Sequence, residues 1–174
     1  MKKVIIILLI ITGIHLYFSW KPSASGIAEK MKVGAVITYQ DKEYKSDWSL
    51  NFEEIKGYLR QKDRHYEKSM PIVTYDLIIT SGEYNGPEIV KISNEGNGNY
   101  YWSAKKQPKG TLTVYHTVPY SVKAQNKLDQ IDVGSNITLV GRISKNSEIE
   151  SGPDNYAKLM HNNHKFILVK DVFE

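Results

Sequence analysis

The sequence of 174 residues contains no cysteine. That absence excludes disulfide bonds, thiolate metal sites and a cysteine nucleophile. The Gly-x-Ser-x-Gly motif of serine hydrolases is also missing. The sequence also lacks a large excess of positive charge, because without Lys2 and Lys3 it has 21 basic and 19 acidic residues. Nucleic-acid-binding domains generally have a strongly basic face, so no nucleic-acid partner is expected.

Formal charge is likewise absent from residues 4–20, which follow Lys2 and Lys3. A helix of this length rises about 25 Å, which is the short limit for crossing a bilayer. Tyr17 and Trp20 lie where the aromatic belt of a membrane interface would be. We therefore predict that residues 1–20 are a signal or anchor segment and that residues 4–20 contact the membrane.

An uncleaved anchor predicts a single-pass protein of the inner membrane whose C-terminal domain is extracytoplasmic. The small residues around Gly26 offer a cleavage site, so the alternative is a soluble periplasmic or secreted protein that starts near Gly26. Residues 21–32 are interpreted as a linker. Residues 33–174 are then predicted to form a single β-rich domain, which is an ordinary length for one domain.

The domain is rich in tyrosine and in β-branched residues, which favour strands. Ser121 is a candidate cap of one helix over residues 121–131. Residues 52–66 fit both a helical and an alternating pattern, and Gly57 favours the strand because glycine weakens a helix. Further strands are predicted over residues 33–39, 72–80, 88–93, 100–102, 111–117 and 136–143.

These elements predict a mainly β fold, either a strongly curved sheet or an open OB-like barrel with one packed helix. Gly141 is expected where the sheet bends or where another element approaches closely. The alternative is an α+β sandwich in which residues 52–66 form a second helix.

Four aromatic residues, Tyr84, Tyr100, Tyr101 and Trp102, are a candidate binding patch. OB-type barrels stack bases or sugars on aromatic side chains, and Tyr and Trp are favoured at contacts between proteins. Alternation along a strand would bury Tyr101 and expose Tyr100 and Trp102, or the reverse. Part of this group therefore also serves core packing.

His161 and His164 are spaced as two metal ligands can be, but such a site needs a third donor such as Asp154 or His116. A closing hairpin that turns at residues 162–163 explains both histidines without a metal, because they would pair across its strands. They are weak metal candidates, and no cofactor is expected.

Several short pieces of residues 52–174 resemble, in order and spacing, a family of small bacterial proteins with an N-terminal membrane segment. The resemblance implies a membrane anchor and a β-rich domain and brings no particular activity. The family pattern has His-Ser-Ala-Asn where this chain has residues 111–114, so a polar site built from that stretch is not carried over. The matching pieces are Asp76-Leu77, residues 82–90, Tyr100-Tyr101-Trp102, residues 116–119, residues 133–136 and Leu139-x-Gly141.

The sequence therefore favours a non-catalytic cell-envelope protein that acts through a protein partner, as an accessory subunit or modulator of an envelope assembly. Confinement to a membrane raises the effective concentration of a neighbouring partner, which suits this role. One alternative is an envelope hydrolase that acts on glycans through surface carboxylates. Another is an OB-like ligand-binding module.

Overall fold

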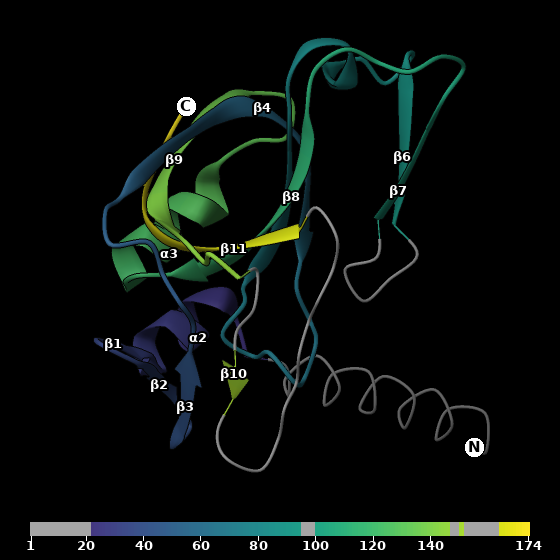
Figure 1. The fold of residues 1–174 in the computed structure, drawn as a ribbon. Coiled ribbons are helices and arrows are strands. Elements are labelled where there is room, and N and C mark those ends of the chain that lie inside the picture. Colours follow the sequence, from purple (N-terminus) through teal and green to yellow (C-terminus); the bar gives the residue numbers. More distant parts are fainter. Residues whose placement is uncertain (1–21, 95–99, 147–149, 152–163) are drawn as a thin grey trace, which may run out of the picture.

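The computed structural model describes residues 22–94, 100–146, 150–151 and 164–174. These residues form a mainly β structure with a closed five-stranded barrel and two α-helices (Figure 1). The prediction of a mainly β fold is confirmed. The barrel is closed, however, where an open one was predicted, and the described residues form two helices where one was predicted. In order around the barrel, the strands are β11 (His164–Phe173), β8 (Leu112–Pro119), β5 (Tyr75–Thr80), β4 (Glu53–Arg64) and β9 (Asn136–Ile143).

Strand β4 has 12 residues and closes the barrel by pairing with both β5 and β9. The α+β sandwich is therefore wrong, because the segment assigned there to a second helix is this strand. Strands β8 and β11 are parallel, and the other neighbours are antiparallel. Register shifts in β4 and in β11 mark bulges, which increase local twist and help a sheet curve into a barrel.

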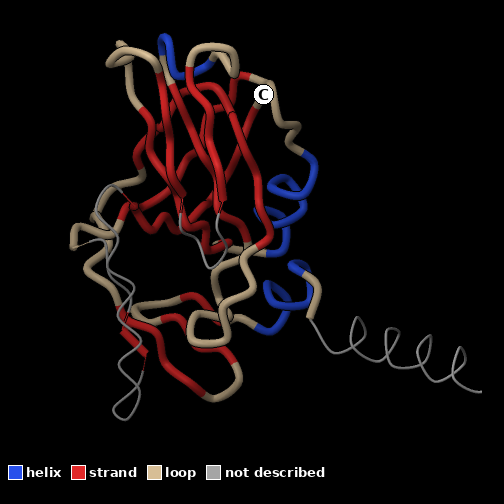
Figure 2. Tube along the Cα trace, turned by 90° about the vertical axis from the view of Figure 1, so that its right-hand side faces the viewer, coloured by secondary structure: helices blue, strands red, loops and turns tan. Residues whose placement is uncertain are grey.

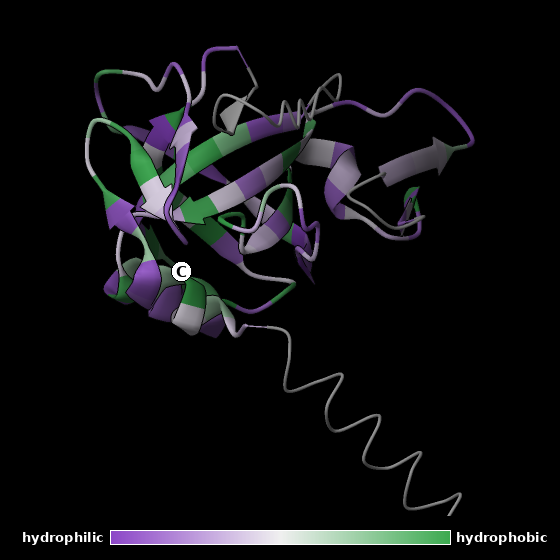
Figure 3. Ribbon diagram, turned by 90° about the horizontal axis from the view of Figure 1, so that it is seen from below, coloured by the Kyte–Doolittle hydropathy of each residue, from purple (hydrophilic) through white to green (hydrophobic). Residues whose placement is uncertain are grey.

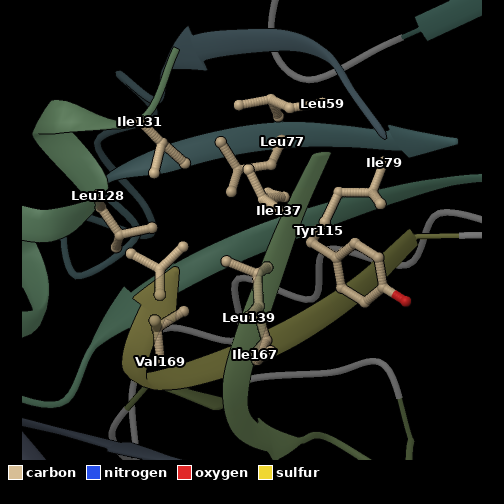
Figure 4. Packing of buried hydrophobic residues seen from close by; sticks show 11 residues of the cluster. Leu59, Leu77, Ile79, Tyr115, Leu128, Ile131, Ile137, Leu139, Ile167 and Val169 are labelled. Atoms are coloured by element: carbon tan, nitrogen blue, oxygen red, sulfur yellow. The ribbon is translucent and has the colours of Figure 1, made fainter. Parts of the chain in front are cut away.

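The barrel interior is apolar and tightly filled (Figure 4). Leu59, Leu77, Leu139 and Ile167 come from four different strands and have no exposed surface. Successive residues of a strand point to opposite faces, so each strand contributes every second side chain to this interior.

Helix α3 (Val122–Gln130) covers one end of the interior with Leu128, and Ile131 just after the helix joins the same cluster. The Ser121 hydroxyl accepts a hydrogen bond from the Ala124 amide at 3.2 Å, so Ser121 caps the helix as predicted. Gly141 lies in β9 against β11, where an added Cβ would meet Ile167 at 2.6 Å and the Leu168 carbonyl oxygen at 2.7 Å. The predicted close approach at Gly141 is confirmed.

A second layer covers part of the outside of the barrel and is visible beside it in Figure 2. Ile27 of the helix and Ile37 and Tyr39 of the sheet pack with Phe166 and Leu168 from the outer face of β11. This layer consists of helix α2 (Ala24–Lys30) and a four-stranded sheet: β1 (Lys32–Val33), β2 (Ile37–Tyr39), β3 (Lys42–Lys45) and β10 (Glu150–Ser151). Most of the segment interpreted as a linker is thus α2, whose apolar face is buried.

A two-stranded hairpin stands beside the barrel and is separate from its strands when the molecule is seen from below (Figure 3). It consists of β6 (Val90–Asn94) and β7 (Tyr100–Ala104) and follows the short 3₁₀ helix η1 (Gly82–Asn85). The hairpin occupies the connection between β5 and β8.

No helix in the part of the chain that the structure describes has the length and apolar character required to cross a membrane. The predicted signal or anchor segment, residues 1–20, lies outside those residues, as does the first strand of the predicted closing hairpin.

Candidate functional site

One row of side chains crosses the outer face of four barrel strands. Asp63 of β4 is opposite Asp76 of β5, and Asp76 is opposite His116 of β8. His116 in turn is beside Phe166 of β11. The row points outward because the next residue of β5, β8 and β11 fills the interior: Leu77, Tyr115 and Ile167.

His65, Asp76 and His116 form a buried group that we call the histidine–aspartate cluster. His65 directly follows β4, where its amide donates to the Thr74 carbonyl and so holds the connection against the start of β5. The Asp76 Oδ1 atom is 3.0 Å from Nδ1 of His65 and 2.7 Å from Nδ1 of His116. All three residues are at most 6% exposed.

His164 and Tyr100 extend the cluster toward solvent. Nδ1 of His164 lies 3.1 Å from Nε2 of His116, and the Tyr100 ring contacts the His164 ring at 6.3 Å between centroids. The Tyr100 hydroxyl donates to Asp63 at 2.8 Å. Both His164 and Tyr100 are half-buried, so this side of the cluster is the nearest to the surface.

Electrostatic effects in the cluster act on Asp76 and on Tyr100. Burial alone would raise the pKa of the Asp76 carboxyl, but hydrogen bonds from His116 and His65 outweigh that effect and hold its pKa well below the ordinary value. Burial raises the pKa of the Tyr100 hydroxyl, and the nearby negative charges of Asp76 and Asp63 raise it further. Asp76 is therefore ionised and Tyr100 is a neutral hydrogen-bond donor.

Two buried atoms beside the cluster have no hydrogen-bond partner among the described residues: His65 Nε2 and Glu67 Oε2. They lie 3.9 Å apart, which is too far for a hydrogen bond. The other Glu67 oxygen accepts a hydrogen bond from the Ser69 hydroxyl.

The four predicted patch residues lie together but differ in burial. Tyr84 of η1 is 6% exposed and packs edge-on against Trp102 of β7, at 5.4 Å between ring centroids. Trp102 is 43% exposed, and Tyr101, on the opposite face of the hairpin, is 55% exposed. Tyr100 faces the barrel and is half-buried. The predicted alternation holds for Tyr100 and Tyr101 but not for Trp102, which is also exposed.

Of the two histidines predicted as weak metal candidates, the structure describes only His164. His161 and Asp154 lie outside the described residues. His164 contacts His116, which was named beforehand as a possible third donor. His65 was missed, because its neighbours in sequence give no metal-ligand spacing. Asp76 offered one signal, a single charge within an otherwise apolar, β-branched run.

Comparisons of this chain with protein-family models, with curated proteins and with solved structures found no match. The resemblance described from the sequence consequently stays a prediction.

The cluster combines groups that bind cations or transfer protons. Each of its three residues offers one ligand atom, and these atoms lie within 4.8 Å of one another, an arrangement that could hold a metal ion once the side chains move closer. An ionised carboxylate between two imidazoles also fixes their ring orientation. Both properties distinguish this face from the apolar interior on the other side of the same strands.

Proposed function

We propose that this protein is a non-catalytic binding module of the cell envelope, whose barrel is of the OB type and which recognises a protein partner through the β6–β7 hairpin. We also propose that residues 4–20 hold it to the membrane with residues 33–174 on the extracytoplasmic side. The observation that carries the proposal is the exposure of Tyr101 and Trp102 on a hairpin that is fixed to the barrel.

The order of the strands supports the OB assignment. Numbered along the chain, the five barrel strands are bonded in the order one, two, three, five, four, with four returning to one. Strands three and five, β8 and β11, form the parallel pair. OB barrels are five-stranded and bind ligands on the face of strands two and three and on the adjacent loops. Here that face belongs to β5 and β8, beside the hairpin.

Contacts to β4 and η1 hold the hairpin in place. Asn94 and Tyr100 both donate to the Asp63 carboxylate, at 2.9 and 2.8 Å. Arg60 donates to the Val90 carbonyl at 3.2 Å. A fixed hairpin loses little conformational entropy on binding, so its exposed aromatic side chains are suited to be the centre of an interface.

Tyr101 gives the sharpest test, because it is exposed on the side of the hairpin away from Trp102. We expect a photoreactive amino acid at position 101 to crosslink the full-length protein to one stoichiometric partner in the membranes of the producing cells. Tyr101→Ala should weaken that complex by about 2 kcal/mol or more, which is roughly 30-fold in Kd. Purification through a C-terminal tag, followed by quantitative mass spectrometry, would measure how much less partner is recovered with Tyr101→Ala than with the unaltered protein.

Phe173→Ala is the matched control, since Phe173 is 49% exposed and ends β11, next to the C-terminus, which lies away from the β6–β7 hairpin in Figure 1. It should leave recovery of the partner unchanged. Recovery of the free protein alone, or an equal loss with Phe173→Ala, would contradict partner binding at the hairpin.

A further inference from the structure

The hydrogen bonds within the histidine–aspartate cluster leave one buried nitrogen, Nε2 of His65, without a partner among the described residues. A His65 ring that carries one proton and donates it from Nδ1 to Asp76 has no proton on Nε2. That atom then faces Glu67 Oε2 at 3.9 Å, so two buried acceptors point at each other. Buried polar atoms without partners are unfavourable and uncommon, which suggests that a component is missing from this arrangement.

We propose that His65, Asp76 and His116 bind one divalent first-row transition-metal ion, such as zinc or iron(II). Nδ1 of each histidine and an oxygen of Asp76 would be the ligands. Around an ion with bonds of about 2.1 Å, neighbouring ligands are about 3.0 Å apart at right angles and about 3.4 Å apart in the tetrahedral geometry of zinc. The two Nδ1 atoms lie 3.0 and 2.7 Å from Asp76 Oδ1, so small shifts would admit the ion.

Metal binding would give both Nε2 atoms a hydrogen-bond acceptor. An imidazole that binds metal through Nδ1 keeps its proton on Nε2 and usually donates it to a second group. For His116 that group is Nδ1 of His164, at 3.1 Å. For His65 it is Glu67 Oε2, because a donor now faces the acceptor and a movement of about 1 Å would complete the hydrogen bond.

The charge at the site also favours a cation. Asp76 is 3% exposed, and no lysine or arginine within the described ranges forms an ion pair with it. A buried carboxylate needs a positive charge or strong hydrogen bonds, and a divalent ion would supply the charge. The Phe166 ring lies 4.8 Å from the His116 ring and limits the access of water to that side. Two histidines and one carboxylate leave further coordination positions open.

The site is independent of the partner binding proposed above, because it uses none of the exposed hairpin residues. The test uses the full-length protein in detergent, purified through a tag without histidines and treated with a chelator. Titration with Co²⁺ should saturate at one ion per chain and give visible absorption bands that report the coordination geometry. Zn²⁺ should displace the Co²⁺, and mass spectrometry of metal content should give the same stoichiometry.

Asp76→Asn should weaken Co²⁺ binding at least about 100-fold, since it removes the charged ligand, and Glu67→Ala should weaken it about 10-fold by removing the acceptor for His65. Asp63→Asn is the matched control, because Asp63 is next to Asp76 in the row but outside the cluster, and it should bind Co²⁺ as the unaltered chain does. Saturable uptake lost in Asp76→Asn and kept in Asp63→Asn supports the site. Absence of stoichiometric uptake by the unaltered protein would overturn it, whether or not Asp76→Asn folds, and so would equal effects of Asp76→Asn and Asp63→Asn.

Discussion

Strands β5 and β8 have two faces of opposite chemistry. Their inward side chains, such as Leu77 and Ile79, pack in an apolar interior that needs no specific partner atoms. Their outward side chains include Asp76 and His116, which are equally buried but hydrogen-bonded. The comparison shows that burial alone does not identify a core. The interior stabilises the barrel by apolar packing, whereas the histidine–aspartate cluster on the outer face depends on particular pairs of atoms.

Leu59→Ala tests the interior and should have the largest effect. Leu59 is fully buried, so the substitution removes apolar contacts and leaves a cavity, with an expected cost of about 2–5 kcal/mol in the free energy of unfolding. Urea unfolding followed by circular dichroism would measure it. Leu50→Ala is the same chemical change at a residue that is 84% exposed, and it should change stability by less than about 0.5 kcal/mol. Similar losses for both would show that the barrel interior is not the main core.

Gly141→Ala tests how closely the interior is packed. The new methyl group would lie 2.6 Å from Ile167 and 2.7 Å from the Leu168 carbonyl oxygen, so β9 and β11 would have to separate. Overpacking of this kind should cost about 1–3 kcal/mol. Urea unfolding is again the measurement. A matched change at Gly34, where the nearest atom to an added Cβ is 3.8 Å away, should be tolerated. Unchanged stability of Gly141→Ala would contradict the close strand approach.

Asp76→Asn tests the outer face in the presence of a chelator. The substitution replaces an ionised carboxylate by a neutral amide, which weakens the hydrogen bonds from both imidazoles. It also puts an NH2 group where Oδ2 lies 3.0 Å from His65 Nδ1, so we expect a cost of about 1–3 kcal/mol. Asp63→Asn should cost less, because Asp63 is only partly buried and keeps an acceptor oxygen for Tyr100. Thermal and urea unfolding of both variants would rank them. A larger loss for Asp63→Asn would reverse the importance that we assign to the two carboxylates.

Ser121→Ala tests the element that closes one end of the interior and should have the smallest effect. The substitution removes the hydroxyl that caps α3 but leaves Leu128 in place, so we expect a loss of about 1 kcal/mol. Ser121→Asp retains a capping acceptor and should stay close to the unaltered protein. A loss by both variants would show that the hydroxyl does more than cap the helix.

Local patterns predicted those elements whose signals lie close together in the sequence. The capping serine Ser121 predicted α3, and the strand predicted over residues 136–143 is β9. Strand β4 was ambiguous, because Phe52, Ile55 and Leu59 fit one helical face whereas Ile55, Gly57 and Leu59 alternate as on a strand. Pairing with β5 and β9 decides it, and no local pattern reports on those partners.

The histidine–aspartate cluster shows the same limit more clearly. His65, Asp76 and His116 come from three places in the sequence and meet only because the strands pair in one register. A register shift of one residue in β8 would turn His116 into the interior. The sequence showed the unusual charge of Asp76 within an apolar run, but its partners depend on the closed barrel. Tyr100, Tyr101 and Trp102 are consecutive, so their proximity could be read from the sequence, whereas a binding role for them stays a prediction.

The position of β11 between β8 and β9 has a consequence for how the chain folds. It is the last of the barrel strands to leave the ribosome, and until then β8, β5, β4 and β9 can form only an open sheet with two unpaired edges. Closure requires pairing between segments that are distant in sequence, which is slow compared with local folding. The nascent protein is therefore exposed to aggregation until β11 has been synthesised, and chaperones that shield strand edges would act on it in that interval.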